Sequence, residues 1–387
     1  MFTPSYTSAL QRLHDFTPRA GRDYASKRNY DDTTGVSTLS PYVRHRIMTE
    51  EDVLRATLTR HSAQAAEKFV QEVYWRTYWK GWLEQRPAVW TSYTLDLTAA
   101  HNRVQTERGL RQEWEAACKG ETGIDCFDHW AHELVQTGYL HNHARMWFAS
   151  IWIFTLRLPW TLGADFFMRH LLDGDPASNT MSWRWVGGLQ TVGKTYLARP
   201  DNIAKYTHGQ FKPHGLATHA VPLDGHPHPA RGPVPISASI DPGLRTGLLL
   251  TEEDLSPGWL LAQIAPVATA AVQTTAYRSP LHVSQTVSDF VRDAMTDCTS
   301  RFAERIGPVS TITPDAITQW AADNDLQQII TSYTPTGPTA DALKGIPLTQ
   351  IIRPYDTQAW PYATHGFFRF KDHIPKLIGH IKGLNLA

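Results

Sequence analysis

The first half of the chain repeats apolar residues with the period of an α-helix. Apolar positions recur every three to four residues over residues 63–86 and again over residues 145–156. This spacing places them on one face of a helix. We find no convincing alternation of apolar and polar residues before residue 213. We therefore predict a front body that is almost entirely helical.

The pattern changes in the second half, where short β-prone runs are separated by helical stretches. The runs are residues 247–250, 268–272, 309–312, 328–330 and 349–352, and the helical stretches include residues 287–306 and 314–324. Strands that alternate with helices in this way are typical of a parallel sheet flanked by helices. We therefore predict a Rossmann-like α/β domain in the rear body.

A stretch rich in histidine, proline and glycine separates the two bodies. Residues 214–242 show almost no hydrophobic periodicity, which is typical of a linker or a surface loop. We therefore expect three parts: a helical domain over residues 1–213, a linker over residues 214–242, and an α/β domain over residues 243–387.

The composition is that of a globular protein with two cores. The 387 residues are 42% hydrophobic, which suffices for two domains of ordinary size. No run approaches the roughly 18 apolar residues of a membrane-spanning helix, and the first ten residues do not read as a signal peptide. Three cysteines in no metal-ligand spacing predict buried thiols and no metal site. We expect a cytoplasmic monomer with no membrane partner.

Charge is balanced over the whole chain but unevenly distributed. Residues 1–213 carry 25 Lys and Arg against 22 Asp and Glu, and the remaining residues carry 12 against 15. The difference is therefore +3 in front and −3 behind. A nucleic-acid groove in the front body is permitted by this charge but not demonstrated by it.

The densest cluster of candidate chemistry is residues 173–185, which combine two acids, an amide and two tryptophans. Such side chains can hydrogen-bond a heteroaromatic ring and carry electrons to it, although Asp-Gly-Asp is also a common turn ahead of a helix. The segment resembles the flavin-binding signature of the DNA photolyase and cryptochrome family. Four further segments resemble the same family in the same order: residues 34–42, 72–76, 120–123 and 141–146.

The resemblance implies a bound FAD whose diphosphate is held by the loop at residues 37–40. This loop consists of Ser37, Thr38, Leu39 and Ser40, and backbone N–H groups and hydroxyls can converge there on phosphate oxygens. A helix N-cap ahead of Pro41 would explain Ser40 alone. Upstream, Tyr24 lies where the family places a flavin-contacting tyrosine.

The resemblance also implies which side chains surround the isoalloxazine ring. Asp173 would pair with Arg145 across the ring, Asp175 would accept a hydrogen bond from the ring's own N–H, and Asn179 would face its N5. A charged pair in a dry pocket is costly unless it is closely made. Removal of either partner of the Asp173–Arg145 pair should therefore weaken cofactor retention.

A substrate-facing pocket is implied by residues on two helices. Glu72 and Trp75 share one face of the helix predicted over residues 63–86, where Trp75 would stack on a flipped pyrimidine pair and Glu72 would hydrogen-bond it. Asn142 and Met146 resemble the pair that cyclobutane-dimer photolyases place against the lesion, and Trp185 would form the other wall. The resemblance therefore implies UV-damaged DNA with a cyclobutane pyrimidine dimer as the partner.

The route of flavin photoreduction is less well marked. Trp183 and Trp160 match the first two tryptophans of the family's electron path, but the third position is Ala117. Trp114 lies one helical turn earlier and is a candidate replacement, while Trp147 and Trp152 are candidates for another route. Tryptophans in helices are more often core residues.

The rear body resembles the antenna domain of the same family more faintly. Residues 247–255 are similar to its opening strand and turn, and residues 366–371 to its closing segment. Because that domain normally comes first, we interpret the order here as a circular permutation; an unrelated α/β domain is the alternative. A folate, a deazaflavin or a flavin are the candidates for a second chromophore.

These resemblances predict a deoxyribodipyrimidine photolyase, in which light drives an electron from reduced FAD to the dimer. Two other functions stay open. One is a cryptochrome-like blue-light photoreceptor without repair activity, and the other is a flavoprotein that binds nucleic acid without repairing it.

Overall fold

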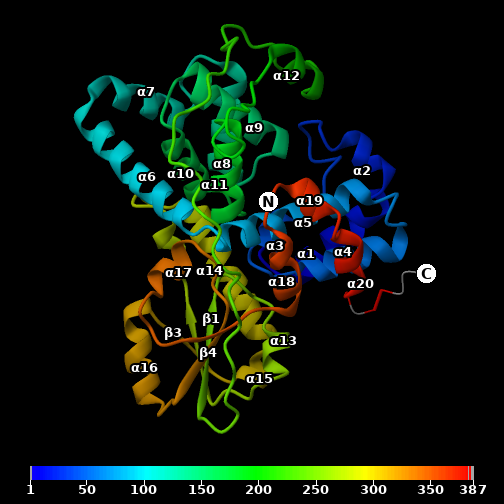
Figure 1. The fold of residues 1–387 in the computed structure, drawn as a ribbon, viewed down its shortest axis with the longest axis vertical. Coiled ribbons are helices and arrows are strands. Elements are labelled where there is room, and N and C mark those ends of the chain that lie inside the picture. The colour runs from blue at the N-terminus through cyan, green and yellow to red at the C-terminus, as the bar shows by residue number, and fades with distance from the viewer. Residues whose placement is uncertain (1, 382, 385–387) are drawn as a thin grey trace.

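The computed structural model describes residues 2–381 and 383–384, which form a helical part and an α/β part (Figure 1). The main helices before residue 213 are α1 (Tyr6–Phe16), α2 (Arg22–Lys27), α3 (Ser40–Arg44), α4 (Glu50–Arg60), α5 (Glu67–Glu84), α6 (Ala88–Thr106), α7 (Arg108–Lys119), α8 (Asp125–Thr137), α9 (Asn142–Ser150), α10 (Trp160–His170), α11 (Pro176–Val186) and α12 (Pro200–Tyr206). A π-helical turn, η2 (Ile151–Thr155), continues α9. Within the described residues no strand precedes residue 246, which confirms the helical prediction for the front body.

Local sequence signals set where several of these helices begin and end. Thr49 and Asp52 form a reciprocal capping box at the start of α4. Gly120 and Gly138 end α7 and α8 in the left-handed conformation, with φ of 69° and 70°, which glycine adopts without steric cost. The turns that orient α8 and α9 are therefore determined by the local sequence.

The α/β part contains a parallel sheet of five strands. They are β1 (Thr246–Thr251), β2 (Ala268–Val272), β3 (Val309–Thr311), β4 (Gln328–Ser332) and β5 (Thr349–Ile351), in the order β3-β2-β1-β4-β5. Each overlaps a predicted run, so the Rossmann-like prediction is confirmed. The helices after β1 are α13 (Gly258–Leu261), α14 (Gln285–Arg301), α15 (Ala303–Ile306), α16 (Ile317–Asp323), α17 (Pro338–Ala342), α18 (Pro354–Ala359), α19 (Phe367–Lys371) and α20 (Ile374–Gly379).

Residues 214–242 cross from the helical part to the sheet without forming a helix or strand. In Figure 1 this green segment descends from the upper helices to β1. Its backbone is hydrogen-bonded to both parts: Gly232 N donates to Gln85 O of the helical part at 2.8 Å, and Ala238 N donates to Gln350 O of β5 at 3.0 Å. The predicted linker is thus a strap held against both parts.

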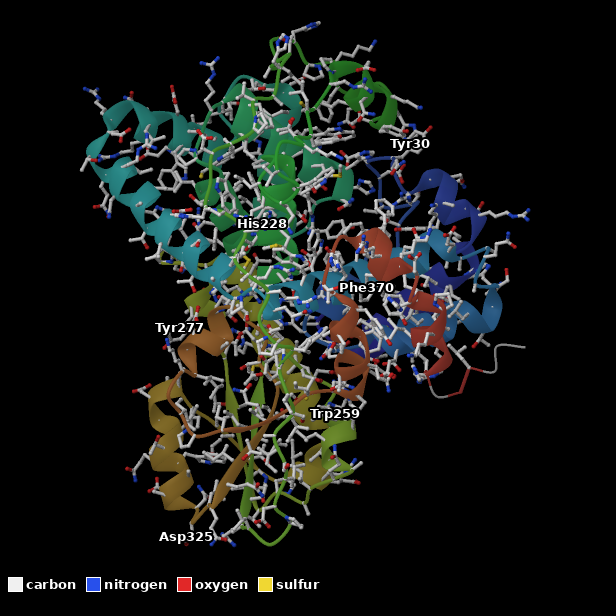
Figure 2. The ribbon with its side chains drawn as sticks, viewed as in Figure 1. Tyr30, His228, Trp259, Tyr277, Asp325 and Phe370 are labelled. Atoms are coloured by element: carbon white, nitrogen blue, oxygen red, sulfur yellow. The ribbon has the colours of Figure 1, made fainter. Side chains whose placement is uncertain are left out.

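The last helices do not stay with the sheet, although we expected residues 243–387 to form one domain. The red helices α18, α19 and α20 lie beside the blue N-terminal helices in Figure 1, and Phe370 is labelled at this junction in Figure 2. Tyr355 and Phe370 belong to the same core as Tyr74 of α5. The physical reason is that α5 has apolar side chains around most of its circumference, so that it needs cover on more than one side.

The first helices share a core with the α/β part. Leu13 of α1 and Tyr42 of α3 are fully or almost fully buried in one cluster with Leu250 of β1 and Phe290 of α14. The two parts are therefore joined by continuous apolar packing. None of the described helices is both long enough and apolar enough to cross a membrane.

Candidate functional site

The acidic turn of Asp173 and Asp175 lies between α10 and α11 and organises the site. Asp175 caps α11, because its Oδ1 accepts a hydrogen bond from Ser178 N at 2.9 Å, and Pro176 occupies the first helical turn. Asn179 and Trp183, four residues apart on α11, are both buried. The turn therefore fixes the helix that carries the expected flavin contacts.

Asp173 and Arg145 meet as expected. Arg145 Nη2 lies 2.8 Å from Asp173 Oδ2, and Arg145 Nε donates to Leu140 O at 2.9 Å. Asp173 is only 6% exposed, and its other oxygen, Oδ1, accepts no hydrogen bond from residues 2–381 or 383–384. A buried carboxylate oxygen without a donor is costly. An N–H donor on a bound ligand would satisfy it, which fits the ring N–H of a flavin.

Asp175 differs from its expected role. Its Oδ2 lies 3.2 Å from Lys80 Nζ, 3.4 Å from Arg76 Nη2 and 3.9 Å from Arg44 Nε. Burial would raise the pKa of this carboxyl, but the charges of Lys80, Arg76 and Arg44 outweigh burial and hold the pKa well below its usual value. Of the two carboxylates, Asp173 is the one with a buried oxygen that has no donor within the described residues.

The cations around Asp175 belong to a larger group, which we call the sheet-edge ion cluster. It consists of Arg44, Arg46, Glu50, Arg76, Lys80, Asp175, Glu252, Glu253, Asp254, Arg278, Arg353 and Asp356. Arg44 binds Glu253 through two hydrogen bonds of 2.7 and 2.8 Å and donates to Gly174 O at 2.8 Å. The cluster therefore ties the acidic turn of the helical part to the carboxyl end of β1.

This position is where open α/β sheets usually bind a ligand, in the crevice beyond the strand ends. Here Glu252, Glu253 and Asp254 follow β1 directly and are at most 5% exposed, each paired with an arginine. Arg353 follows β5 and is also buried. These residues do not fit a second chromophore at the sheet edge, because their charges already satisfy one another.

The loop expected to hold the diphosphate is compact and carries a cation that sequence reasoning missed. Arg12 Nη1 of α1 donates to Thr38 Oγ1 at 2.8 Å, and Leu39 N donates to Ser37 Oγ at 3.3 Å. Thr38 has a φ of 51°, a strained value for a β-branched residue. Leu39 is buried and Ser40 begins α3. No motif in the sequence links Arg12 to this loop.

Tyr24 lies behind the loop in an aromatic cluster. Its ring centroid is 5.9 Å from that of Phe16 and 5.1 Å from that of Phe69. It is 8% exposed, and burial raises the pKa of its phenol. The tyrosine is therefore neutral and able to pack against a bound ring or donate a hydrogen bond to it.

The expected lesion-facing residues are brought together by the segment at residues 28–29. Arg28 forms an ion pair with Glu72 of α5, and Asn29 O is hydrogen-bonded to His143 Nδ1 of α9 at 2.7 Å. Burial raises the pKa of Glu72 against the opposing charge of Arg28. Next to His143, Asn142 is exposed and its Nδ2 lies 3.9 Å from Met146 Sδ.

Each of the two tryptophans expected to form the lesion walls stacks one face of its ring on another aromatic residue. The Trp75 ring stacks on Phe367 of α19, with centroids 3.7 Å apart and an interplanar angle of 11°. Trp185 stacks on Tyr196 at 5.5 Å and 26°. Sequence reasoning missed Phe367, which lies 292 positions from Trp75 in the chain.

The structure links two of the three proposed electron-transfer tryptophans. The Trp183 ring reaches α10 so closely that a Cβ on Gly163 would lie 2.3 Å from it, and Gly163 is one turn from Trp160. Trp152 bridges the same space, since its ring is 6.2 Å from Trp183 and its Nε1 donates to Pro159 O at 3.0 Å. Trp114 instead packs on His101 at 6.1 Å. Among the ring contacts of the described residues, none joins Trp114 to Trp160.

Comparison with known proteins gives matches confined to about half of the chain. Residues 69–214 match the family described as the FAD binding domain of DNA photolyase. The deoxyribodipyrimidine photo-lyase of Thermus thermophilus is 33% identical over 200 residues, covering 50% of this chain and 45% of that protein. The photo-lyase of the same name from Vibrio cholerae is 28% identical over 203 residues, covering 50% of this chain and 41% of the relative.

A solved bacterial class III photolyase from Agrobacterium tumefaciens is also similar, with 27% sequence identity and a TM-score of 0.43. The similarity covers 53% of this chain and 43% of that structure. The chain spans less than half the length of these curated relatives.

Proposed function

The chain belongs to the DNA photolyase and cryptochrome family, and from this premise we propose that it repairs cyclobutane pyrimidine dimers in DNA under light. The observation that carries the proposal is the arrangement on α9. Arg145, which pairs with Asp173, lies between Asn142 and Met146 on this helix. The flavin-facing pair and the proposed lesion-facing pair are therefore within one helical turn of each other.

In this proposal, residues of the helical part would hold FAD, which supplies the light absorption and the one-electron chemistry. Asp173 Oδ1 accepts a hydrogen bond from the flavin ring, and Arg145 holds the Asp173 carboxylate in place. Ser37, Thr38 and Ser40 bind the diphosphate, with Leu39 anchoring their loop in the core. Asn179 faces the ring from α11, where its Nδ2 donates to Ala164 O at 2.8 Å.

The proposed lesion site uses Glu72, Asn142, Met146 and the tryptophans. Trp75 and Trp185 are only half-buried, and each has one ring face against an aromatic side chain. We assign their opposite faces to the flipped bases. We assign to Glu72 a proton or a hydrogen bond given to the dimer, since burial raises the pKa of its carboxyl against the opposing charge of Arg28.

We also propose that the α/β part is the family's antenna-type domain, placed behind the flavin domain by permutation. Its five-stranded parallel sheet supports this assignment. The filled sheet edge argues against a second chromophore there, so that we derive no step through one. Photoreduction is assigned to Trp183 and Trp160, and not to Trp114.

The test is repair of a defined oligonucleotide. The purified protein, loaded with FAD and chemically reduced, is incubated with a thymine-dimer oligonucleotide under blue light, and restored thymines are measured by chromatography. We expect restoration in light and none in the dark. Glu72→Gln should lower the repair yield several-fold. Glu67→Gln on the same helix should not, because Glu67 pairs with Lys371 at the surface.

The stack of Phe367 on Trp75 favours one alternative, a cryptochrome-like photoreceptor, because part of the lesion wall is already covered. In that case the flavin would bleach and recover under light without any preference of the protein for damaged DNA. Binding of the damaged strand without restored thymines would instead identify a nucleic-acid-binding flavoprotein. Either result, obtained with folded and flavin-loaded protein, would overturn the repair proposal.

A further inference from the structure

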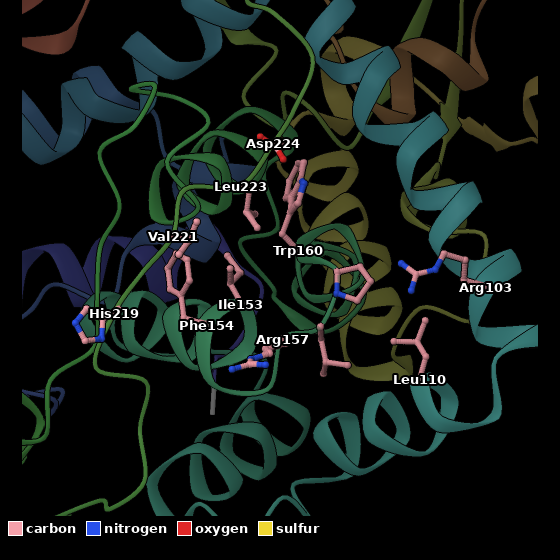
Figure 3. Close-up of a pocket in the computed structure, with 12 residues that line it drawn as sticks. Arg103, Leu110, Ile153, Phe154, Arg157, Trp160, His219, Val221, Leu223 and Asp224 are labelled. Atoms are coloured by element: carbon pink, nitrogen blue, oxygen red, sulfur yellow. The ribbon is translucent and has the colours of Figure 1, made fainter.

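A cleft of about 520 Å³ opens on the helical part beside Trp160 (Figure 3). Its apolar walls come from α7, η2, the start of α10 and the strap, and include Leu110, Phe154, Trp160, Val221 and Leu223. Val221 is 76% exposed although it is a large apolar residue. A concave site of this size with mostly apolar walls and a few polar groups is typical of small-molecule binding.

One cation of the cleft has no partner among the residues that the structure describes. Arg157 lines it and is exposed, and no ion pair or hydrogen bond of its side chain occurs among the described residues. Its φ is 55°, in the left-handed region that arginine seldom adopts. Arg157 lies two residues after the π-helical turn η2, and π-helical turns and left-handed non-glycine residues are both concentrated at functional sites. The other arginine of the cleft, Arg103, is already paired with Glu107 at 2.7 Å.

The strap contributes two groups to the cleft that can accept a proton. His219 and Asp224 of the strap line the cleft with Arg157, as Figure 3 shows. The cleft therefore offers a cation, an aromatic wall and a proton acceptor. A flat ring with an acidic group and a hydroxyl matches these three features.

Trp160 lies between the cleft and the buried tryptophans of the helical part. It lies one turn from Gly163, against which the Trp183 ring packs, and Trp152 bridges the two segments. An electron lost from Trp160 to the interior can therefore be replaced from a molecule in the cleft. The sequence has no tryptophan at the third position of the expected path, and no ring contact among the described residues joins Trp114 to Trp160.

We propose that this cleft binds a phenolic carboxylate, which reduces Trp160 after light-driven oxidation of that residue. The carboxylate pairs with Arg157 and the ring packs on Trp160. In the redox step the phenol O–H bond breaks: one electron passes to the oxidised Trp160, which returns to neutral tryptophan, and the proton passes to His219 or Asp224. The phenol becomes a phenoxyl radical, so that charge and electrons balance. This step rests on the proposed function, whereas binding in the cleft does not.

Binding is tested in the dark on the full chain, with 4-hydroxyphenylacetate as the probe and isothermal calorimetry as the readout. We expect Arg157→Gln to weaken binding about tenfold or more, as loss of a charge-assisted hydrogen bond does, and Arg157→Lys to weaken it less. Arg60→Gln, an exposed arginine on α4, serves as the matched control and should bind like the unmodified protein. Tyramine, which has the phenol but a cation in place of the carboxylate, should bind at least about tenfold more weakly.

The electron step is tested by illuminating the FAD-loaded protein and following the flavin absorbance. 4-Hydroxyphenylacetate should speed photoreduction several-fold, and phenylacetate, which lacks the hydroxyl, should not. Trp160→Phe should abolish the acceleration.

The site would be overturned if the protein did not bind 4-hydroxyphenylacetate in the dark. It would also be overturned if Arg157→Gln bound the probe as tightly as the unmodified protein and tyramine bound as tightly as the probe. Dark binding without any acceleration in protein that holds FAD would overturn the redox role. Protein that binds the probe but takes up no FAD would contradict the proposed function and leave the site intact.

Discussion

Two carboxylates of one turn, Asp173 and Asp175, are separated by a single glycine and face opposite environments. Asp173 has one cation, Arg145, and a buried oxygen without a donor. Asp175 has Lys80, Arg76 and Arg44 within 4 Å. The difference indicates that the flavin side of the turn offers a free acceptor to a ligand, whereas the carboxylate on the sheet side is already paired with cations of the chain. Each prediction below tests one side of this contrast.

We expect the largest effect on stability from removing the Arg44–Glu253 ion pair on the sheet side of the turn. Arg44→Met removes the bidentate partner of Glu253 and leaves that buried carboxylate with only the more distant Lys80, at 3.8 Å, as a cation among the described residues. We expect the free energy of unfolding to fall by about 3–5 kcal/mol, measured by urea denaturation. The matched control is Arg103→Met in the exposed Arg103–Glu107 pair, where a change within about 0.5 kcal/mol is expected. Equal effects of the two substitutions would show that burial of the cluster adds no stability.

Acid should also lower the stability that the sheet-edge ion cluster contributes. The pKa of Glu253 is lowered to about 2: burial raises it, but the charges of Arg44 and Lys80 outweigh burial. Since the folded pKa lies below the unfolded value near 4.5, this contribution to stability is present above about pH 4.5 and is lost as the pH falls toward 2. We expect a loss of about 3 kcal/mol over that interval, with Asp175 adding to it. Thermal unfolding followed at a series of pH values measures the slope, and Glu253→Gln should flatten it.

On the flavin side, Asp173→Asn should act on cofactor binding more than on folding. The variant removes the charge that pairs with Arg145 and replaces one acceptor with an amide. We expect FAD to bind about 10- to 100-fold more weakly, with a change in unfolding free energy of about 1 kcal/mol, measured by flavin fluorescence titration and denaturation. Asp175→Asn should reverse the order of the two effects. If both variants lose FAD equally without loss of stability, the contrast between the two carboxylates is wrong.

The smallest expected effect concerns Glu133, which together with Asp173 influences the buried Tyr139. Burial and then the charge of Asp31 raise the pKa of Glu133 to about 7. Because the folded pKa is raised, the stabilising contribution is present below about pH 4.5 and is lost as the pH rises through 7. Glu133→Gln should therefore stabilise the fold by about 1 kcal/mol more at pH 8 than at pH 5, after allowance for partial exposure. A pH-independent effect would contradict this assignment.

Much of the fold could be predicted from the order of apolar and polar residues along the sequence. Apolar residues recur every three to four residues in helices, whereas buried strands are short continuous apolar runs. The five strands and the helices α5, α14 and α16 fall where periodicity placed them. The packing of α18–α20 on α5 could not be read, because residues 366–371 were interpreted as the end of the sheet domain. The aromatic residues of this segment could pack on the sheet or on α5. They pack on α5 because that helix has apolar side chains around most of its circumference.

For the candidate site, motif spacing found residues on the same local element but not their partners from elsewhere. Asp173, Arg145, Asn142 and Met146 were expected and lie as a connected group. Arg12, Arg28 and Phe367 were missed, since their partners Thr38, Glu72 and Trp75 lie 26, 44 and 292 positions away. Asp175 was given a flavin contact because its motif says nothing of Lys80 or Glu253.

The sequence by itself determined the helical front body, the parallel sheet, the strap between them and the side chains available for flavin chemistry. These features depend on local periodicity, on turn-forming residues and on short motifs, all of which act over a few residues. Tertiary structure alone decided which carboxylate is neutralised and which is left with an open oxygen. The reason is that burial and charge pairing depend on groups brought together from distant parts of the chain, and a buried charge is stable only where those groups meet.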